Sequence, residues 1–359
     1  MRTGPRPIFL HLVNAMQIAA QQDKNFSLER YLQGLAGYMD SLEKIKPQES
    51  RPVAWQKGDV QLYGSLDNDK ANVNVLLVPS LINGSEIFDL MPGYSFYAFL
   101  QQEGFNPLLL DWGNPERAGK ETLDNYIADF LVPAITELPK QPKPLFVLGY
   151  CMGGLMVISA LQNIEQDNIH PIFMATPWDF HAGVDVMIKN AGYLWQQGQL
   201  YKDVTDFVPI DLLQAFFASV DPENTAQKFA NFLEIQDETA KTLFILIEDW
   251  LNNGHALNHN IFETCMHDWY LQNETGRGAW KSCGRVVTPA AIKNPSLCVI
   301  PTRDKLVPPS TAKPLCALLK QNSLIEPETG HIGLMGSIRA KEKVWTPIVK
   351  WMKEIYVSK

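Results

Sequence analysis

The sequence has no apolar stretch long enough to cross a membrane and no excess of positive charge. A membrane-spanning helix needs about 20 consecutive apolar residues, whereas His11 and Asn14 interrupt the N-terminal apolar run. We interpret that run as an amphipathic helix and not as a signal peptide. The formal net charge of −8 argues against a nucleic-acid partner, which requires a basic surface. We therefore expect a cytoplasmic globular protein.

Cysteine is scarce and irregularly spaced. No two of the five cysteines form a C-x-x-C pair: Cys151, Cys265, Cys283, Cys298 and Cys316. An odd number in a chain of 359 residues indicates neither a disulfide framework nor a zinc site. His255 and His259 are four residues apart, as metal ligands on one helix face can be, but no carboxylate lies between them. We expect no metal and no separate cofactor.

Short apolar runs alternate with amphipathic stretches along much of the chain. The runs lack strict alternation, as strands covered on both faces do; they are Val73–Pro79, Asn106–Trp112, Leu145–Tyr150, Pro171–Ala175, Ser296–Pro301 and, more weakly, Leu324–Glu326. Helical patterns occur at Ser95–Glu103, Leu123–Leu138, Met152–Asn163 and Lys341–Tyr356. This order predicts a single α/β domain over residues 1–359, with a central, mostly parallel sheet and flanking helices.

Residues 179–287 interrupt this alternation. The segment has no good strand candidate and is rich in Phe, Trp, Leu, Asp and Asn. An insertion there would lie at the carboxyl ends of the strands, where open α/β sheets bind ligands. We predict a helical lid over the site; the alternative is an extra helical layer with no role in access. Residues 1–60 are predicted to form an N-terminal helical segment.

The strongest chemical signal is the sequence Gly149-Tyr150-Cys151-Met152-Gly153, which follows the apolar run at Leu145. It has the nucleophile-elbow pattern G-x-Ser-x-G with cysteine in place of serine. Such a turn places the sulfur at a helix N-terminus, where the dipole favours a thiolate and the Met152 N–H can donate to an oxyanion. The alternative is that Cys151 is an ordinary buried cysteine. The strand-turn-helix context favours the nucleophile.

Two later residues lie where such a nucleophile needs its partners. Asp304 follows the run Ser296–Pro301, and His331 lies in a loop before the C-terminal helix. An Asp here can also cap a turn, and a His can also be a surface residue. The order nucleophile, acid and base nevertheless predicts an α/β-hydrolase fold with a Cys151-His331-Asp304 triad.

A second oxyanion donor is expected in the loop after an earlier strand. That loop begins at Pro79, and its best candidates are the backbone N–H groups of Leu81 and Ile82. The alternative interpretation is that this loop is an ordinary strand-to-helix turn with no catalytic role.

Several segments then resemble, in register, the polyhydroxyalkanoate synthases. They are Gly4–Pro7, Val78–Asn83, Asp111–Gly113, Gly149–Gly154, Thr176–Phe180, Val307–Pro309 after Asp304, and His331–Gly333. The cysteine elbow followed by two glycines is the most specific of them. The chain departs from these synthases after Trp250, where it reads Leu251-Asn252-Asn253-Gly254-His255.

This resemblance implies an acyltransferase. A 3-hydroxyacyl group would pass from coenzyme A to Cys151, forming a thioester, and then to a growing polyester, with His331 as base and Asp304 orienting it. Coenzyme A would act as part of the substrate. The resemblance also allows a homodimer or a separate helical partner subunit, and a location on polyester granules.

Two rival functions use the same scaffold. An intracellular depolymerase or thioesterase would pass the acyl group to water through the same triad. A non-catalytic binding protein would have no need of a nucleophile, a base and an acid at these three positions.

Overall fold

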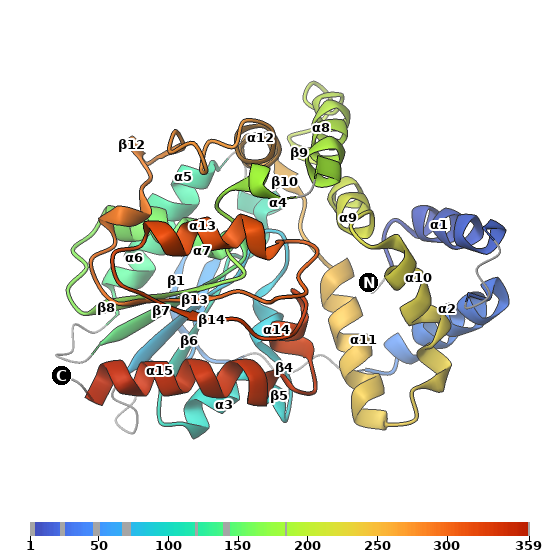
Figure 1. Ribbon diagram of the computed structural model, residues 1–359, viewed down its shortest axis with the longest axis horizontal. Coiled ribbons are helices and arrows are strands. Elements are labelled where there is room, and N and C mark those ends of the chain that lie inside the picture. Colours follow the sequence, from blue (N-terminus) through green and yellow to red (C-terminus); the bar gives the residue numbers. More distant parts are fainter. Residues whose placement is uncertain are drawn as a thin grey trace.

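The computed structural model describes residues 4–21, 26–45, 51–66, 73–118, 121–138, 144–183 and 185–357. Its centre is an eight-stranded sheet in the order β1-β2-β6-β3-β7-β8-β13-β14 (Figure 1). The strands are β1 Val53–Lys57, β2 Val60–Tyr63, β3 Asn74–Val78, β6 Asn106–Asp111, β7 Leu145–Tyr150, β8 Ile169–Met174, β13 Ser296–Val299 and β14 Asn322–Ile325. From β6 to β14 all neighbours pair in parallel, so the predicted mostly parallel sheet is confirmed.

The six strands predicted from the sequence are all present, but β1 and β2 were not predicted. They form an antiparallel hairpin at the edge of the sheet, and β2 pairs antiparallel with β6. The side chains of β1 are all exposed or only half buried, so its sequence carries no clear apolar signal. The hairpin also corrects the N-terminal prediction, because the last part of residues 1–60 is strand and not helix.

Helices cover both faces of the sheet, and alternate side chains of one strand reach opposite layers. Leu76 and Val78 of β3 pack in one buried cluster with α7 and α13, whereas Val75 and Leu77 pack in another with α3 and α15. The flanking helices are α3 Phe96–Gln102, α4 Pro115–Ala118, α5 Leu123–Asn125, η2 Tyr126–Leu131, α6 Val132–Thr136, α7 Met152–Gln162, α13 Pro309–Leu318, η7 Lys341–Trp345 and α15 Thr346–Val357. Burial on both faces explains why the sequences of the parallel strands are continuous apolar runs.

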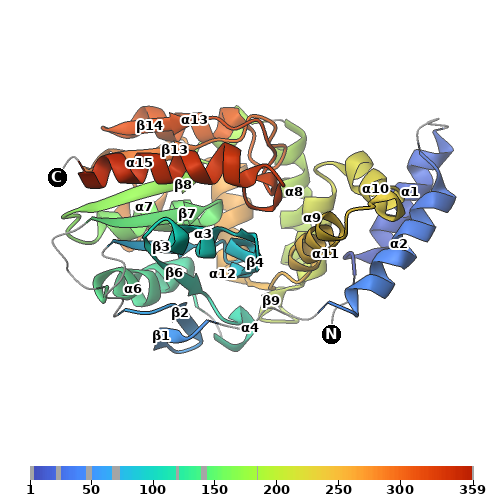
Figure 2. The same ribbon diagram turned by 90° about the horizontal axis from the view of Figure 1, so that it is seen from below.

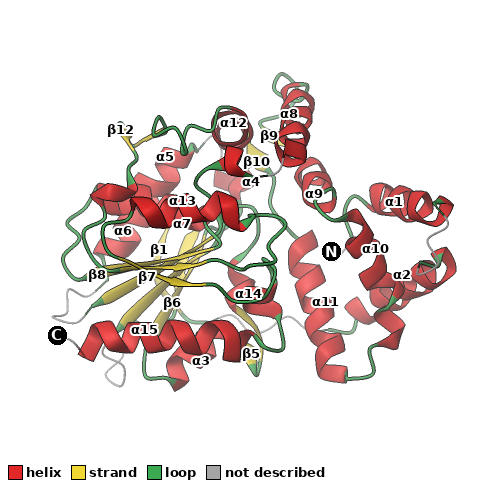
Figure 3. Cartoon of the chain, in the orientation of Figure 1, coloured by secondary structure: helices red, strands yellow, loops and turns green. Residues whose placement is uncertain are grey.

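A second, all-helical region lies beside the sheet region (Figures 2 and 3). The N-terminal helices α1 (Ile8–Ala20) and α2 (Leu28–Leu42) pack there against α10 and α11, and not against the sheet. Their shared core is aromatic, with Tyr38 in edge-on contact with Phe229, Phe232 and Phe244. Lys228 and Glu248 form an ion pair at its side, with Nζ 2.7 Å from Oε1.

The segment 179–287 supplies the rest of the helical region and an additional layer near the sheet. Its elements are η3 Phe180–Ala182, α8 Asp185–Gln199, α9 Ile210–Ala218, α10 Pro222–Ala230, η4 Phe232–Glu234, α11 Glu238–Asn252, α12 His259–Glu263 and η5 Thr264–Leu271. Two short antiparallel pairs of strands, β9 (Phe207–Val208) with β10 (Leu257–Asn258) and β11 (Lys281–Ser282) with β12 (Arg285–Val286), were not expected. Within the described ranges no helix has the length and apolarity to cross a membrane.

Candidate active site

Cys151 occupies the turn between β7 and α7. Its backbone has φ 55° and ψ −122°, a region that residues other than glycine rarely adopt. A residue held in such a sparsely populated region costs about 1–3 kcal/mol. Two hydrogen bonds hold the turn: the Cys151 N–H donates to the Met174 carbonyl at 2.8 Å, and the Gly154 N–H donates to the Cys151 carbonyl at 3.0 Å. The strain is therefore held in place by the strand on one side and the helix on the other.

The glycines of the motif allow the helix to approach the strands. A Cβ on Gly149 would lie 2.5 Å from Gly154 Cα, and one on Gly153 would lie 2.4 Å from the Val78 carbonyl oxygen. Both distances are shorter than atoms in contact allow, and the obstacles are backbone atoms that cannot rotate away. Glycine at these positions thus lets α7 begin directly above the ends of β3 and β7.

Asp304 and His331 form a buried pair. Asp304 Oδ2 accepts a hydrogen bond from His331 Nδ1 at 2.7 Å, and both residues are nearly inaccessible to solvent. Asp304 Oδ1 accepts from the N–H groups of Leu306 and Val307, at 2.9 and 2.8 Å. Since three hydrogen bonds fix the carboxylate, it in turn fixes the orientation of the imidazole. The two residues follow β13 and β14, as their positions in the sequence predicted.

The electrostatics favour a protonated His331. Burial of the imidazole lowers its pKa, but the charges of Asp304 and Cys151, and hydrogen bonds with both, raise the pKa of His331 from 6.5 to about 10. The positive imidazolium is thus stabilised while Cys151 carries a negative charge. A charged imidazole beside Cys151 is the kind of partner that activates a cysteine nucleophile.

Tyr150 supports His331, and this residue was missed in the sequence. Its ring stacks on the imidazole with centroids 5.1 Å apart and planes at 22°. Its hydroxyl donates to the His331 carbonyl oxygen at 3.1 Å. Burial, and then the charges of Cys151 and Asp304, raise the Tyr150 pKa far above its usual value, so the hydroxyl remains a donor. The elbow pattern leaves this position open, and an aromatic residue with a hydroxyl there was the only available signal.

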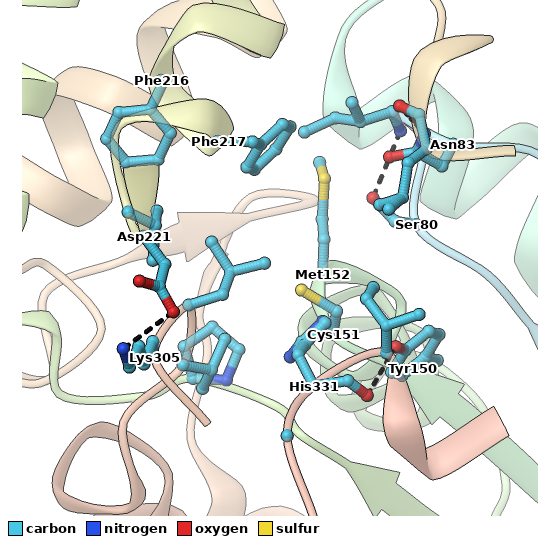
Figure 4. Close-up of a pocket in the computed structure, with 18 of the residues that line it drawn as sticks. Ser80, Asn83, Tyr150, Cys151, Met152, Phe216, Phe217, Asp221, Lys305 and His331 are labelled. Atoms are coloured by element: carbon cyan, nitrogen blue, oxygen red, sulfur yellow. Dashed lines mark hydrogen bonds and ion pairs between the residues drawn. The ribbon is translucent and has the colours of Figure 1, made fainter. Parts of the chain in front are cut away.

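A cavity of about 410 Å³ opens in front of Cys151 and His331. Figure 4 shows Phe216 and Phe217 across the cavity from these two residues. Other lining residues from the segment 179–287 are Phe180, Val220, Asp221, Asn224, Thr225, Trp250, Leu251, Cys265, Met266, Trp269 and Tyr270. The segment therefore forms one wall of the cavity, largely apolar, opposite the nucleophile. Its motion as a lid stays a prediction.

Of the expected oxyanion donors, Met152 and Ile82 line the same cavity, whereas Leu81 is buried and is not among its lining residues. Met152 is the first residue of α7, whose first N–H groups have no partner within the helix. The Ile82 N–H already donates to Ser80 Oγ, at 3.2 Å. The assignment of Met152, Leu81 and Ile82 to an oxyanion hole stays a prediction.

The cavity lining includes the charged side chains of Asp221, Arg303 and Lys305. Lys305 Nζ lies 2.7 Å from Asp221 Oδ2, which joins the loop of Asp304 to the segment 179–287 (Figure 4).

His255 and His259 are separated by β10, and the described residues contain no group of three or more His, Cys, Asp or Glu suited to a metal ion.

Comparison with known proteins agrees with this architecture. A model of the alpha/beta hydrolase fold matches residues 73–337, which span every strand from β3 to β14. The chain belongs to the α/β-hydrolase-fold family. A DcsB complex with its substrate analogue has a similar fold, with a TM-score of 0.52 at 14% identity over 83% of this chain and 94% of that one.

The resemblance to polyhydroxyalkanoate synthases is confirmed by named relatives. The chain is 31% identical to a poly(3-hydroxyalkanoate) polymerase subunit of Haloferax mediterranei, over 84% of this chain and 63% of that protein. It is 26% identical to the subunit of the same name from Synechocystis, over 91% of this chain and 90% of that protein. The chain thus spans less than two thirds of the Haloferax protein but nearly all of the Synechocystis one.

Proposed function

We propose that the protein is a polyhydroxyalkanoate synthase-like acyltransferase that moves 3-hydroxyacyl groups from coenzyme A, through a thioester on Cys151, to a polyester. The observation that carries the proposal is the hydrogen-bonded Asp304-His331 pair together with a cysteine on a strained strand-to-helix turn, with Cys151 and His331 lining one cavity. The relatives named as polymerase subunits support the choice of substrate.

The first step exchanges one thioester for another. The Cys151 thiolate attacks the acyl carbonyl carbon, and the negative oxygen meets the N–H groups at the start of α7. The carbon-sulfur bond to coenzyme A then breaks, and the leaving thiolate takes the proton of His331. Because a thioester replaces a thioester, the step has little free-energy cost.

The second step transfers the acyl group to a hydroxyl. The charge of Cys151 is one cause of the raised His331 pKa, so acylation, which removes that charge, lowers the pKa again. His331 becomes a better base and accepts the proton of an incoming 3-hydroxyl. The new carbon-oxygen bond forms, the Cys151 thioester breaks, and the thiolate-imidazolium pair returns.

The rival function is hydrolysis by a depolymerase or thioesterase with the same three residues. The acyl-enzyme reacts with whichever acceptor is nearest, so exclusion of water decides between the two. The apolar wall formed by Phe216, Phe217 and Trp250 favours a bound hydroxyacyl group over water.

The deciding experiment is incubation with labelled 3-hydroxybutyryl-CoA and a short hydroxybutyrate primer. We expect release of coenzyme A together with labelled oligomers longer than the primer. Release of coenzyme A with only free 3-hydroxybutyrate would establish a hydrolase. The reaction is repeated with any partner subunit, because a homodimer and a helical partner subunit both stay predictions. The granule location and the absence of a further cofactor also stay predictions.

A further inference from the structure

The wall of the cavity opposite the nucleophile contains an unusual helix. Residues Thr264–Leu271 form the π-helix η5, and four of its side chains line the cavity: Cys265, Met266, Trp269 and Tyr270. π-helical turns are rare and occur frequently at functional sites. This turn brings two adjacent pairs of side chains, four residues apart, to the same cavity.

The ring of Tyr270 is held rigidly within this wall. It packs edge-on against Phe180, with centroids 4.7 Å apart, and against Phe216, with centroids 5.5 Å apart. His181 Nε2 lies 3.0 Å from the Tyr270 carbonyl oxygen, which also fixes the backbone. These contacts fix the ring of Tyr270 within the wall.

The hydroxyl of Tyr270 has no hydrogen-bond partner within the described ranges of the chain. The Tyr150 hydroxyl, in contrast, donates a hydrogen bond to the His331 carbonyl oxygen. Burial, followed by the charges of Cys151, Cys265 and Asp304, raises the pKa of Tyr270, so the hydroxyl stays protonated within electrostatic reach of the nucleophile. It is a free donor and acceptor whose ring neighbours in the wall, Phe180 and Phe216, are apolar.

We infer that the Tyr270 hydroxyl binds the 3-hydroxyl group of the acyl chain on Cys151 and thereby selects hydroxyacyl over plain acyl substrates. The inference rests on the proposed function and adds to it the residue that recognises the 3-hydroxyl group of the substrate. The acyl carbonyl oxygen can be met by the N–H groups at the start of α7, and the charged part of coenzyme A belongs at the mouth. The 3-hydroxyl is the one polar group left, and burying it unpaired against Phe216 and Met266 would be unfavourable.

The test compares 3-hydroxybutyryl-CoA with butyryl-CoA, which can acylate Cys151 but has no 3-hydroxyl. Release of coenzyme A in a single turnover reports acylation of the protein by each substrate. The wild type should prefer the hydroxyacyl substrate. Tyr270→Phe should lower its rate with 3-hydroxybutyryl-CoA by about tenfold, the usual loss for one hydrogen bond, and leave the butyryl-CoA rate unchanged.

The matched control is Tyr126→Phe, which removes a buried tyrosine hydroxyl that has no hydrogen-bond partner among the described residues and does not line the cavity. Its preference should equal that of the wild type. An unchanged preference in Tyr270→Phe, or an equal loss with both substrates, would overturn the inference and leave the proposed function standing. A wild type that releases coenzyme A from neither substrate would overturn the proposed function itself.

Discussion

The sheet region and the helical region contribute different things to one cavity. Cys151, Asp304 and His331 all follow strands of the sheet, and each is held by backbone hydrogen bonds or by a buried partner. The facing wall comes from the segment 179–287, whose Phe216, Met266 and Trp269 belong to the same buried cluster as β3 and α7, while α11 also reaches the aromatic cluster beside the Lys228-Glu248 pair. Strands fix the geometry that bond making requires, whereas a segment that covers a site and moves comes from the less stable parts of a fold. We therefore expect substitutions in the sheet region to change the rate of chemistry, and those in the helical region to change selection and access.

The sharpest test of this division is Cys151→Ala. Without the sulfur no thioester can form, so release of coenzyme A from 3-hydroxybutyryl-CoA should fall to background. Cys283→Ala is the control, because Cys283 is half buried beside Asp124, away from the cavity lining, and should retain full activity. Full activity in Cys151→Ala would place the chemistry elsewhere in the molecule.

Substitution of the base, His331, should have the next largest effect on activity. His331→Gln keeps a side chain of similar reach but cannot shuttle a proton, so acylation should slow by at least about 100-fold. Stopped-flow detection of the released thiol measures this step. An acylation rate equal to that of the wild type would show that another residue serves as base.

The charge on His331 should also be visible in the pH dependence of stability. Its pKa in the folded protein, about 10, lies above the unfolded value of 6.5. A raised pKa stabilises the fold fully below the unfolded pKa, and this stabilisation disappears as the pH rises through the folded value. Between pH 7 and pH 10 the wild type should therefore lose more unfolding free energy than His331→Gln. Urea titrations at both pH values measure the difference, and parallel losses would contradict the raised pKa.

Hydrogen exchange tests the helical region directly. We expect faster exchange in α9 to α11 than in β7 and β8, and a change in that exchange when a non-hydrolysable substrate analogue binds. Lys228→Met leaves Glu248 buried without its partner and should increase exchange in α2 and α10 while β7 stays protected. Slow exchange throughout, unaffected by the analogue, would favour the static helical layer over a lid.

The sequence predicted the sheet region better than it predicted the helical region. Strands such as β3 and β7 were predictable because burial on both faces makes them continuously apolar, and the glycines around Cys151 marked the turn. The packing of α1 and α2 on α10 was not predictable, since it depends on contacts between residues as distant as Tyr38 and Phe229. Likewise, Ser80 occupies the Ile82 N–H, a local pairing that no spacing in the motif reveals.

Tyr150 supplies the smallest predicted effect and the most specific one. Tyr150→Phe keeps the ring stacked on His331 but removes the hydrogen bond to its carbonyl, worth about 1 kcal/mol. Acylation should therefore slow by only about three- to tenfold. Tyr150→Leu also removes the aromatic face, which stabilises a neighbouring cation, so the His331 pKa measured by NMR should fall in that variant. Tyr126→Phe should change neither the rate nor the pKa. If Tyr150→Leu lowers the rate without moving the pKa of His331, the ring contributes packing alone, and the electrostatics of the site rest on Asp304 and Cys151.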